Sequence, residues 1–355
     1  MRAKPLRTAL SLLFFALSGV LGAPEISCRN EDGEAVDWFI FYKLPKRTSE
    51  ASEETGLQYL YLDSTRQTWN KSHNLINSST SALGRTLQQL YAAHDSKNDT
   101  AYLIYNDGVP GSVNYNRQYG HTKGLLVWTR MQGFWLIHSV PKFPPVPERG
   151  YDYPTSGRRY GQTGICITFR YSQFEAIDSQ VFIVKPNIYS CFIPSTFHWE
   201  LIHMPQMCAN FSSSKIPAQH LTVLQSARGL NFVHFAKSSF YTDDIITAWI
   251  AQRLKTHLLA QTWQKKNQEL PSNCSLPYHV YNIKAIGETQ SYFSSRQDHS
   301  KWCVSIKGSA NRWTCIGDLN RSPHQALRGG GFICTKNRYI YQAFHKLVLH
   351  YGRCK

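Results

Sequence analysis

The 355-residue sequence contains nine cysteines but no Cys-x-x-C pair, so a structural zinc site is a weak interpretation. It also has no cluster of His, Asp and Glu at the spacing of metal ligands. Beyond the first 21 residues, no apolar run approaches the roughly 18 residues that a membrane-spanning helix needs. No low-complexity linker divides the chain. We therefore expect one globular body with no cofactor, no resident metal and no membrane span.

Acidic residues are scarce, with 23 Asp and Glu against 39 Lys and Arg, which gives a formal net charge of +16. A strongly basic protein suggests a polyanionic partner, which is nucleic acid, a glycosaminoglycan or an anionic membrane surface. Solubility alone is the simpler explanation of the charge. In an acidic compartment the 14 His add further positive charge, because their reference pKa is about 6.5.

The N-terminus has the features of a secretory signal peptide. Arg2, Lys4 and Arg7 precede an apolar segment over residues 9–21, and small residues follow it. We expect residues 1–22 to be removed, leaving a soluble chain in a lumenal or extracellular compartment.

All nine Cys follow this segment, so most should pair in an oxidising compartment, and the odd number leaves at least one free. Six Asn-x-Ser/Thr sequons support the same compartment. They begin at Asn70, Asn77, Asn98, Asn210, Asn273 and Asn320.

Apolar periodicity predicts a mixed α/β chain. In the first part, strands are expected at 36–44, 56–62, 100–105, 133–140 and 164–170, and a helix at 78–94. In the second part, strands are expected at 180–184, 220–224, 230–235 and 331–335, and helices from Thr242 or Asp243 to about 263 and from 339 to 350. We divide the mature chain into two similar halves, residues 23–195 and 196–355, with the functional site between them.

Two short motifs carry the chemistry: His121-Thr-Lys123 and His299-Ser-Lys301, each followed by an apolar segment typical of a strand. Residues i and i+2 of a strand point to the same face, so each motif directs an imidazole and an ammonium the same way. One His-x-Lys arises easily by chance in a chain this rich in His and Lys. Two copies, half a chain apart, supply two histidines and two cations, which suits cleavage of a phosphodiester without a metal.

Seven segments resemble the deoxyribonuclease II family, the acid DNases of lysosomes, over nearly the whole mature chain. They are Val36-Asp-Trp-Phe, Tyr42-Lys-Leu-Pro45, Gly120-His-Thr-Lys-Gly124, Phe134-Trp-Leu-Ile-His-Ser-Val-Pro141, Pro271-Ser-Asn-Cys-Ser275, Asp298-His-Ser-Lys-Trp-Cys303 and Trp313-Thr-Cys-Ile-Gly-Asp318. The high basic charge is more like that of the beta paralogue than that of the alpha paralogue.

The resemblance implies a phospholipase-D-like fold, with two similar halves, each a sheet flanked by helices, and the active site at their interface. It also implies metal-independent endonucleolytic hydrolysis of double-stranded DNA at acid pH, with little sequence preference and with 3′-phosphate and 5′-hydroxyl products. The expected location is the lysosome, reached through the secretory pathway, with secretion as an alternative destination.

The same resemblance assigns the catalytic roles. One of His121 and His299 attacks phosphorus to form a phosphohistidine and the other protonates the leaving oxygen, while Lys123 and Lys301 stabilise the developing charge. Which histidine is the nucleophile stays open.

His138 and Asn320 are expected to support the site or bind phosphate. The superfamily places an Asp five residues after each Lys, but Trp128 and Ile306 stand there in this sequence. The carboxylate that orients each histidine must come from elsewhere or be absent. Asp298 is a poor substitute, because its side chain points to the opposite face of a regular strand.

The resemblance also guides the disulfides, which are expected at Cys28–Cys166, Cys274–Cys354 and Cys315–Cys334. The states of Cys191, Cys208 and Cys303 are left open, with a Cys191–Cys208 bridge and a free Cys303 as the expected arrangement. A nucleophilic role for Cys303 is disfavoured, because a thiol there would need an activating base. Glycans are expected at Asn70, Asn77, Asn98, Asn210 and Asn273, but not at Asn320, since Pro323 follows the sequon and a glycan would block the DNA groove.

Several alternatives stay open. Lys43, Lys46 and Arg47 line a DNA groove or belong to a solvated loop, and Arg328-Gly-Gly-Gly331 binds a phosphate or forms a plain turn. A phospholipase or exonuclease of the same superfamily would share every catalytic residue, although a lipid substrate needs an apolar mouth. A non-catalytic secreted glycoprotein that binds polyanions is the alternative from another class.

Overall fold

The computed structural model describes residues 25–49, 52–96, 99–113, 115–210, 215–265, 267–288 and 291–354. The predicted signal peptide and Asn98 lie outside the described residues. Within them, no helix is both apolar enough and long enough to cross a bilayer.

The first half forms an antiparallel sheet. Its strands, in spatial order, are β12 (Ile188–Phe192), β8 (Ala101–Asn106), β9 (Lys123–Trp128), β10 (Gln132–His138), β11 (Gln162–Arg170), β3 (Trp38–Lys43), β6 (Tyr59–Asp63) and β7 (Asn70–Lys71). Two small ribbons accompany it: β1 (Cys28–Arg29) with β2 (Ala35–Val36), and β4 (Arg47–Ser49) with β5 (Ser52–Glu54).

The second half forms a second sheet, in which only the β15–β16 pair is parallel. Its order is β13 (Gln219–Gln225), β14 (Asn231–Lys237), β20 (Gly330–Thr335), β19 (Thr314–Gly317), β18 (Trp302–Ser305), β15 (Leu258–Gln261), β16 (Val280–Glu288) and β17 (Ser291–Ser294), with β21 (Val348–Tyr351) also paired to β16. The helices are α1 (Ala82–Ser96), α2 (Phe174–Val184), α3 (His203–Cys208), the π-helical η5 (Ile245–Ile250) with α4 (Ala251–Leu254), α5 (Pro323–Ala326) and α6 (Arg338–Lys346).

The main core lies between the two sheets and takes residues from both halves, including Trp135, Trp302 and Phe344. Strand β3 shows how the sequence builds this arrangement. Successive strand residues face opposite sides, so Trp38, Ile40 and Tyr42 enter the central core while Phe39 and Phe41 enter an outer core under α1. The strand therefore reads as a continuous apolar run.

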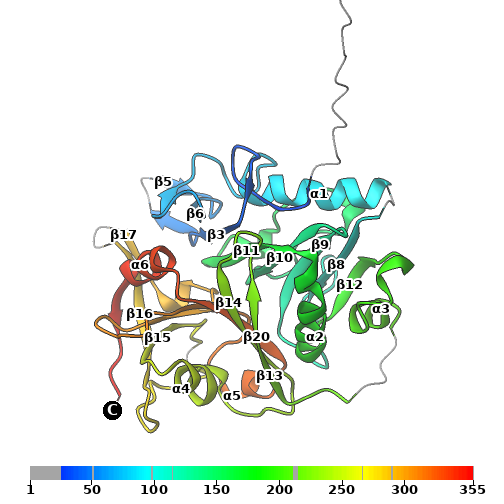
Figure 1. Ribbon diagram of the computed structural model, residues 1–355. Coiled ribbons are helices and arrows are strands. Elements are labelled where there is room, and N and C mark those ends of the chain that lie inside the picture. The colour runs from blue at the N-terminus through cyan, green and yellow to red at the C-terminus, as the bar shows by residue number, and fades with distance from the viewer. Residues whose placement is uncertain are drawn as a thin grey trace, which may run out of the picture.

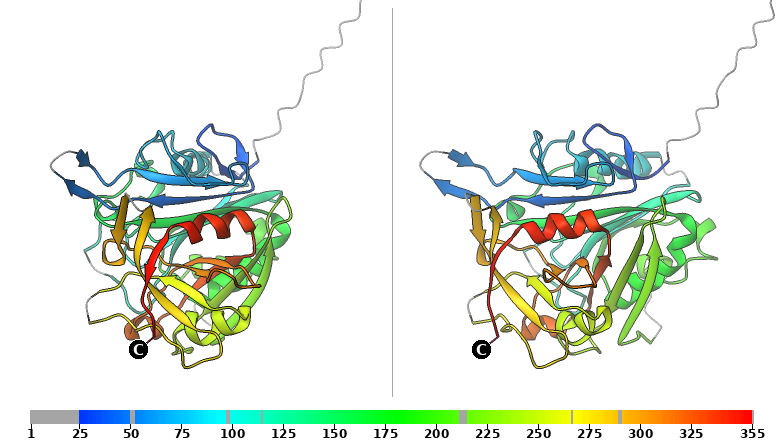
Figure 2. Two further views of the ribbon diagram at one scale, coloured as in Figure 1. Left: turned by 90° about the vertical axis from the view of Figure 1, so that its left-hand side faces the viewer. Right: turned by 60° about the vertical axis from the view of Figure 1, so that its left-hand side comes forward.

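Helices cover both the inner and the outer faces of the sheets. Helix α1 covers the outer face of the first sheet, and η5 with α4 covers that of the second (Figure 1). Helix α6 lies between the sheets, against β18 and β19 (Figure 2), and α2 contacts β13 and β14. The predicted α/β architecture of two sheet-bearing halves is confirmed.

The two halves repeat one order of elements. Strands β9, β10 and β11 are followed by α2 and β12, and strands β18, β19 and β20 are followed by α6 and β21. In each case the middle strand of the three pairs with both of its sequence neighbours. Strand β12 belongs to the first sheet and β13 to the second, while the boundary at residue 195 stays a prediction.

Three expected elements are wrong in type or length. Residues 180–184 end helix α2 rather than forming a strand, because a short apolar segment fits either period. The helix expected from Thr242 or Asp243 to 263 is capped by Asp244 and ends at Leu254, where Lys255 adopts a left-handed conformation (φ 52°). Leu258, which continues its apolar spacing, belongs to β15. The final helix ends at Lys346, and β21 follows.

Candidate active site

A cavity of about 830 Å³ lies between the halves, and His121, Lys123 and His299 all line it. The structure thus brings three of the four predicted catalytic side chains to one space. The fourth, Lys301, is fully buried beneath it. Its Nζ donates to the backbone oxygen of His299 and lies 3.2 Å from His299 Nδ1. Lys301 therefore contacts the histidine directly rather than the open cavity.

His121 precedes β9 and is held by the second half of the chain. Its backbone N–H donates to Gly329 O at 2.8 Å. Its Nδ1 lies 2.7 Å from the backbone oxygen of Asp318, which can only accept, so Nδ1 carries the hydrogen. Nε2 is left available to the cavity, with the Asp107 carboxylate 3.8 Å away.

His299 precedes β18 and is held by the first half in the same manner. Its backbone N–H donates to Gly161 O at 2.8 Å. Its Nδ1 lies 3.1 Å from Ser139 O and 3.2 Å from Gln162 Oε1. The Trp263 ring packs edge-on against the imidazole, with the ring centroids 4.7 Å apart.

The supports of the two histidines are therefore crossed. Nδ1 of His121, in the first half, donates to the backbone carbonyl of Asp318, which follows β19 of the second half. Nδ1 of His299, in the second half, donates to the backbone carbonyl of Ser139, which follows β10 of the first half. The Asp318 carbonyl fixes the tautomer of His121. At His299 two oxygens, Ser139 O and Gln162 Oε1, favour the same tautomer, although Lys301 Nζ also lies 3.2 Å from Nδ1. This tautomer leaves Nε2 free to act as a nucleophile or to carry a second proton.

No carboxylate side chain bonds Nδ1 of either imidazole among the described residues, but Asp107, which follows β8, lies beside His121. It accepts from Lys123 Nζ at 2.5 Å and from Arg328 at 3.3 Å. Burial raises its pKa, but the charges of Lys123, His121 and Arg328 lower it more strongly, so the carboxylate stays ionised at acid pH. Sequence reasoning missed it because Asn106-Asp107-Gly108 reads as an ordinary turn.

Both histidines are tuned for acid pH. Burial lowers the pKa of His121 well below its ordinary value, and the charge of Lys123 lowers it further while Asp107 opposes the shift. Burial also lowers the pKa of His299 well below its ordinary value, and the charges of Lys301 and Lys123 lower it further. An imidazolium here therefore requires acid conditions or a bound anion.

Two further carboxyls are buried next to the motifs. Asp298 accepts from Tyr42 Oη at 2.5 Å and from Ser300 Oγ at 2.6 Å, so it turns away from the imidazole of His299, as predicted for the opposite face. Asp318 accepts from Thr122 Oγ1 at 2.9 Å, and burial raises its pKa to about 7.

The two auxiliary residues have different positions. Asn320 lines the cavity, and its Oδ1 accepts from the backbone N–H of Trp263 at 3.1 Å, so it holds the residue that packs on His299. His138 is 1% exposed and does not line the cavity; its Nδ1 accepts from Val140 N. Phosphate binding by His138 does not fit this position, which leaves support of its neighbours.

The glycine run after Arg328 is neither a phosphate loop nor a plain turn. Gly330 and Gly331 lie on β20, Gly329 accepts from His121, and the N–H of Gly331 donates to Asp318 at 3.3 Å. The glycine run therefore holds His121 and Asp318, whose backbone oxygen accepts from the His121 imidazole.

The basic residues at positions 43–47 are divided between core and surface. Lys43 is fully buried, so it does not line a groove. Lys46 lines a second, basic cavity with Arg158, Arg159 and Arg296. Arg47 donates to Tyr292 O at 3.0 Å.

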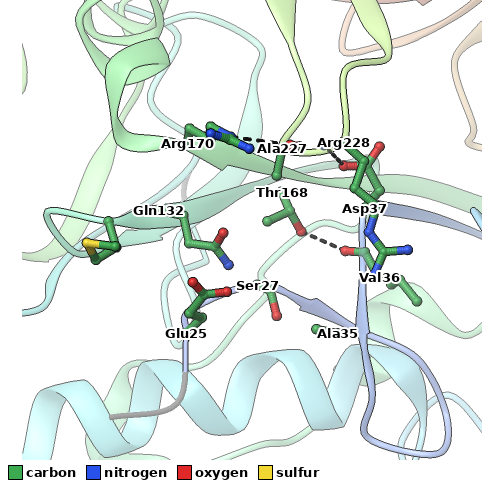
Figure 3. Close-up of a pocket in the computed structure, with 11 residues that line it drawn as sticks. Glu25, Ser27, Ala35, Val36, Asp37, Gln132, Thr168, Arg170, Ala227 and Arg228 are labelled. Carbon is green, nitrogen blue, oxygen red and sulfur yellow. Dashed lines mark hydrogen bonds between the residues drawn. The ribbon is translucent and has the colours of Figure 1, made fainter. Parts of the chain in front are cut away.

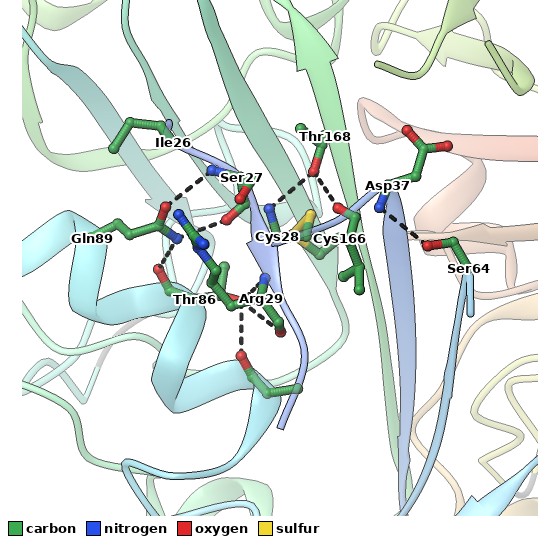
Figure 4. Close-up of a disulfide and its surroundings, with 12 residues drawn as sticks. Ile26, Ser27, Cys28, Arg29, Asp37, Ser64, Thr86, Gln89, Cys166 and Thr168 are labelled. Carbon is green, nitrogen blue, oxygen red and sulfur yellow. Dashed lines mark hydrogen bonds between the residues drawn. A yellow bond between two sulfur atoms is a disulfide. The ribbon is translucent and has the colours of Figure 1, made fainter. Parts of the chain in front are cut away.

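Four disulfides are present: Cys28–Cys166, Cys191–Cys208, Cys274–Cys354 and Cys315–Cys334. They comprise the three pairs implied by the resemblance and the Cys191–Cys208 bridge. The first joins β1 to β11 (Figure 4). Cys303 is a free, buried thiol whose pKa burial raises, which is the opposite of what a nucleophile needs.

A smaller cavity of about 380 Å³ lies near the start of the described chain (Figure 3). Glu25, Asp37 and Arg170 are among its lining residues, and no predicted catalytic residue belongs to it. It is separate from the candidate active site.

The cavity position of Asn320 leads to a prediction about glycosylation. Asn70, Asn77 and Asn210 are exposed and Asn273 is half-buried, whereas Asn320 faces the cavity and bonds the backbone of Trp263. We expect glycan on Asn70, Asn77, Asn98, Asn210 and Asn273 and none on Asn320. Glycopeptide mass spectrometry of the active secreted protein checks this, and a glycan at Asn320 in active molecules would contradict it.

A family model described as Deoxyribonuclease II matches residues 27–354. The chain is 84% identical to deoxyribonuclease-2-beta of Mus musculus (100% of each chain) and 70% identical to that of Homo sapiens (100% of this chain and 99% of the relative). Identity to deoxyribonuclease-2-alpha of Mus musculus is 37%, over 98% of each chain. The predicted resemblance, including its preference for the beta paralogue, is confirmed.

Proposed function

The chain belongs to the deoxyribonuclease II family, and we propose that it hydrolyses DNA phosphodiesters endonucleolytically at acid pH, without a metal ion, leaving 3′-phosphate and 5′-hydroxyl ends. The observation that carries the proposal is the crossed support of His121 and His299 beside one cationic cavity. Two imidazoles with fixed tautomers and free Nε2 atoms supply both a nucleophile and a general acid.

We assign the nucleophile to His299 and the general acid to His121. The Asp107 carboxylate lies 3.8 Å from Nε2 of His121, where it favours the protonated ring. Lys123 and Lys301 favour the neutral form of both rings, but only His121 also has a carboxylate that opposes them. The asymmetry between two otherwise matched histidines thus separates their roles.

The reaction then proceeds in two steps, attack on phosphorus by His299 and hydrolysis of the resulting phosphohistidine. Nε2 of neutral His299 forms a bond to phosphorus as the bond from phosphorus to the 5′-oxygen breaks, and protonated His121 gives that oxygen its proton. The DNA is left attached through its 3′-phosphate to His299. His121, now neutral, takes a proton from water, whose oxygen displaces His299 and releases a 3′-phosphate.

The cavity suits a phosphodiester backbone better than a lipid. Its lining includes Arg117, Lys123, Lys265 and Arg328, and aromatic rings at Tyr115, Tyr160 and Trp263. Cations that contact phosphates carry little sequence information, which supports double-stranded DNA as a substrate with little sequence preference. The four cations of this lining match a chain of phosphates better than a single lipid headgroup.

The four disulfides and the acid-tuned histidines also support our proposal that the enzyme acts in the lysosome, which it reaches through the secretory pathway.

Cleavage of supercoiled DNA at pH about 5 is expected to persist at full rate in EDTA, because protonated His121 and the neighbouring cations supply the positive charge that a Lewis acid would supply elsewhere. The ends should accept label from polynucleotide kinase without phosphatase treatment, since they carry 5′-hydroxyls. Cleavage that is lost in EDTA and restored by Mg²⁺ or Zn²⁺ would overturn the metal-independent mechanism.

A further inference from the structure

Two buried lysines outside the cavity occupy equivalent places in the two halves. Lys43 ends β3 and Lys237 ends β14, and both are 0% exposed. Their partners across the sheet are Gln162 at the start of β11 and Gly330 at the start of β20. A buried ammonium is costly unless its hydrogens are bonded, so the groups that accept from these lysines indicate what the lysines do.

Both ammonium groups donate to backbone oxygens of the segment that leads into the neighbouring strand. Lys43 Nζ donates to Arg158 O at 2.7 Å and to Tyr160 O. Lys237 Nζ donates to Ala326 O at 2.8 Å and to Arg328 O at 2.6 Å. It also donates to Tyr241 O at 2.8 Å and to Ser238 O at 3.4 Å, in the loop that follows β14. Arg158 and Tyr160 lie four and two residues before Gln162, the strand partner of Lys43. Ala326 and Arg328 lie four and two residues before Gly330, the strand partner of Lys237. The arrangement is therefore repeated although the local sequences differ.

These bonded segments are the ones that hold the catalytic histidines. Directly after Tyr160, Gly161 accepts from the backbone N–H of His299, and Gln162 contacts its imidazole. Directly after Arg328, Gly329 accepts from the backbone N–H of His121. Lys43 of the first half is therefore connected through residues 158–162 to His299 of the second half. Lys237 of the second half is connected through residues 326–329 to His121 of the first half.

Ion pairing does not explain the two lysines. Among the described residues, no carboxylate lies within salt-bridge distance of either ammonium, and the closest opposing influences are Asp298 on Lys43 and Asp244 on Lys237. Burial lowers the pKa of Lys43 to about 7 and that of Lys237 to about 8. Below pH about 6 both groups are charged and hold all three of their hydrogens.

We propose that Lys43 and Lys237 are a matched pair of positioning residues, in which Lys43 fixes the segment that holds His299 and Lys237 fixes the segment that holds His121. This inference rests on the proposed two-histidine mechanism. Neither lysine touches the substrate. Each acts through backbone carbonyls on the catalytic group of the opposite half.

The test replaces each lysine by methionine, which keeps an unbranched chain of similar length and removes the donors. We expect kcat on DNA at pH about 5 to fall about 10- to 100-fold with KM changed less than about threefold, because misplacement of a catalytic group by about 1 Å can cost about 10²-fold. Lys307→Met, at an exposed turn after β18, is the matched control and should retain the kcat of the unmodified enzyme.

A substrate with a p-nitrophenolate leaving group separates positioning from general destabilisation, because such a group departs without a proton. Each lysine variant should share the substrate dependence of the histidine that it supports. The loss in Lys237→Met should shrink on the p-nitrophenyl 3′-phosphodiester of thymidine, as in His121→Ala, while the loss in Lys43→Met should persist, as in His299→Ala.

Equal losses on both substrates in both lysine variants, or a lowered Tm with unchanged kcat, would overturn the proposal. Full activity in the histidine variants would instead refute the proposed function itself, so the two failures are distinguishable. Where a methionine variant does not fold, Lys43→Gln or Lys237→Gln, which keeps the donors of an amide NH₂ group, takes its place and should show the same substrate pattern with a smaller loss.

Discussion

His299→Ala and His121→Ala are each expected to reduce cleavage of supercoiled DNA by at least about 10³-fold, since the two imidazoles act as one unit. The double variant should be little slower than either single variant for the same reason. The backbone N–H of each residue keeps its bond to Gly329 O or Gly161 O in the alanine variants, so the fold should stay intact. Initial rates at pH about 5, with circular dichroism and DNA affinity measured in parallel, provide the check.

The leaving group then distinguishes the two residues. With a p-nitrophenyl ester the general acid is dispensable, so His121→Ala should recover much of its activity while His299→Ala stays inactive. The reverse pattern would exchange the two roles, and wild-type activity in either single variant would refute the two-histidine site. His73→Ala, on an exposed loop of the first half, is the control and should be as active as the unmodified enzyme.

The pH profile of kcat/KM is the second large effect, with an expected maximum below pH 6.5 and a fall of about tenfold per pH unit on the alkaline side. Burial lowers the pKa values of both histidines, so the general acid loses its proton already on the acid side of neutrality. On the acid limb the nucleophile becomes protonated and the rate falls again. Stopped assays in constant ionic strength check this, and a flat profile from pH 5 to 8 would contradict it.

Asp107→Asn shows which limb belongs to His121. The Asp107 carboxylate raises the pKa of His121, so its neutral analogue should lower that pKa and move the alkaline limb to lower pH. The maximum rate should also fall, because Lys123 and Arg328 lose the negative charge that they share. Movement of the acid limb instead would mean that His121 is the nucleophile.

The sequence revealed the reacting groups more fully than the groups that hold them. Two His-x-Lys copies at strand starts predicted a site between two halves, because a period of two places both side chains on one face. Asp107 was missed because its signal is a turn tripeptide, and it meets Lys123 only through the pairing of β8 with β9. The supporting roles of Ser139 and Asp318 depend on backbone carbonyls, and no side-chain pattern encodes these.

The errors in secondary structure have the same origin. Residues 180–184 are apolar enough for a strand, but they complete a helix that packs on the opposite sheet, which is a tertiary contact. The long helix expected in the second half ends where Lys255 turns left-handed, and this conformation is rare for lysine and has no local signal. The sequence predicted a surface position for Lys43, in a DNA groove or a solvated loop. Its burial is explained only by its position at the end of a strand that is covered on both faces.

The crossed carbonyls have a consequence for how the enzyme is made. A chain still being synthesised exposes His121 long before Asp318 and Gly329 exist, and His299 is translated long after the segment that will hold it. No nascent or prematurely terminated polypeptide that lacks residue 329 can fix both imidazoles. A fixed pair of imidazoles therefore requires the chain through Gly329 and the packing of the two sheets on each other.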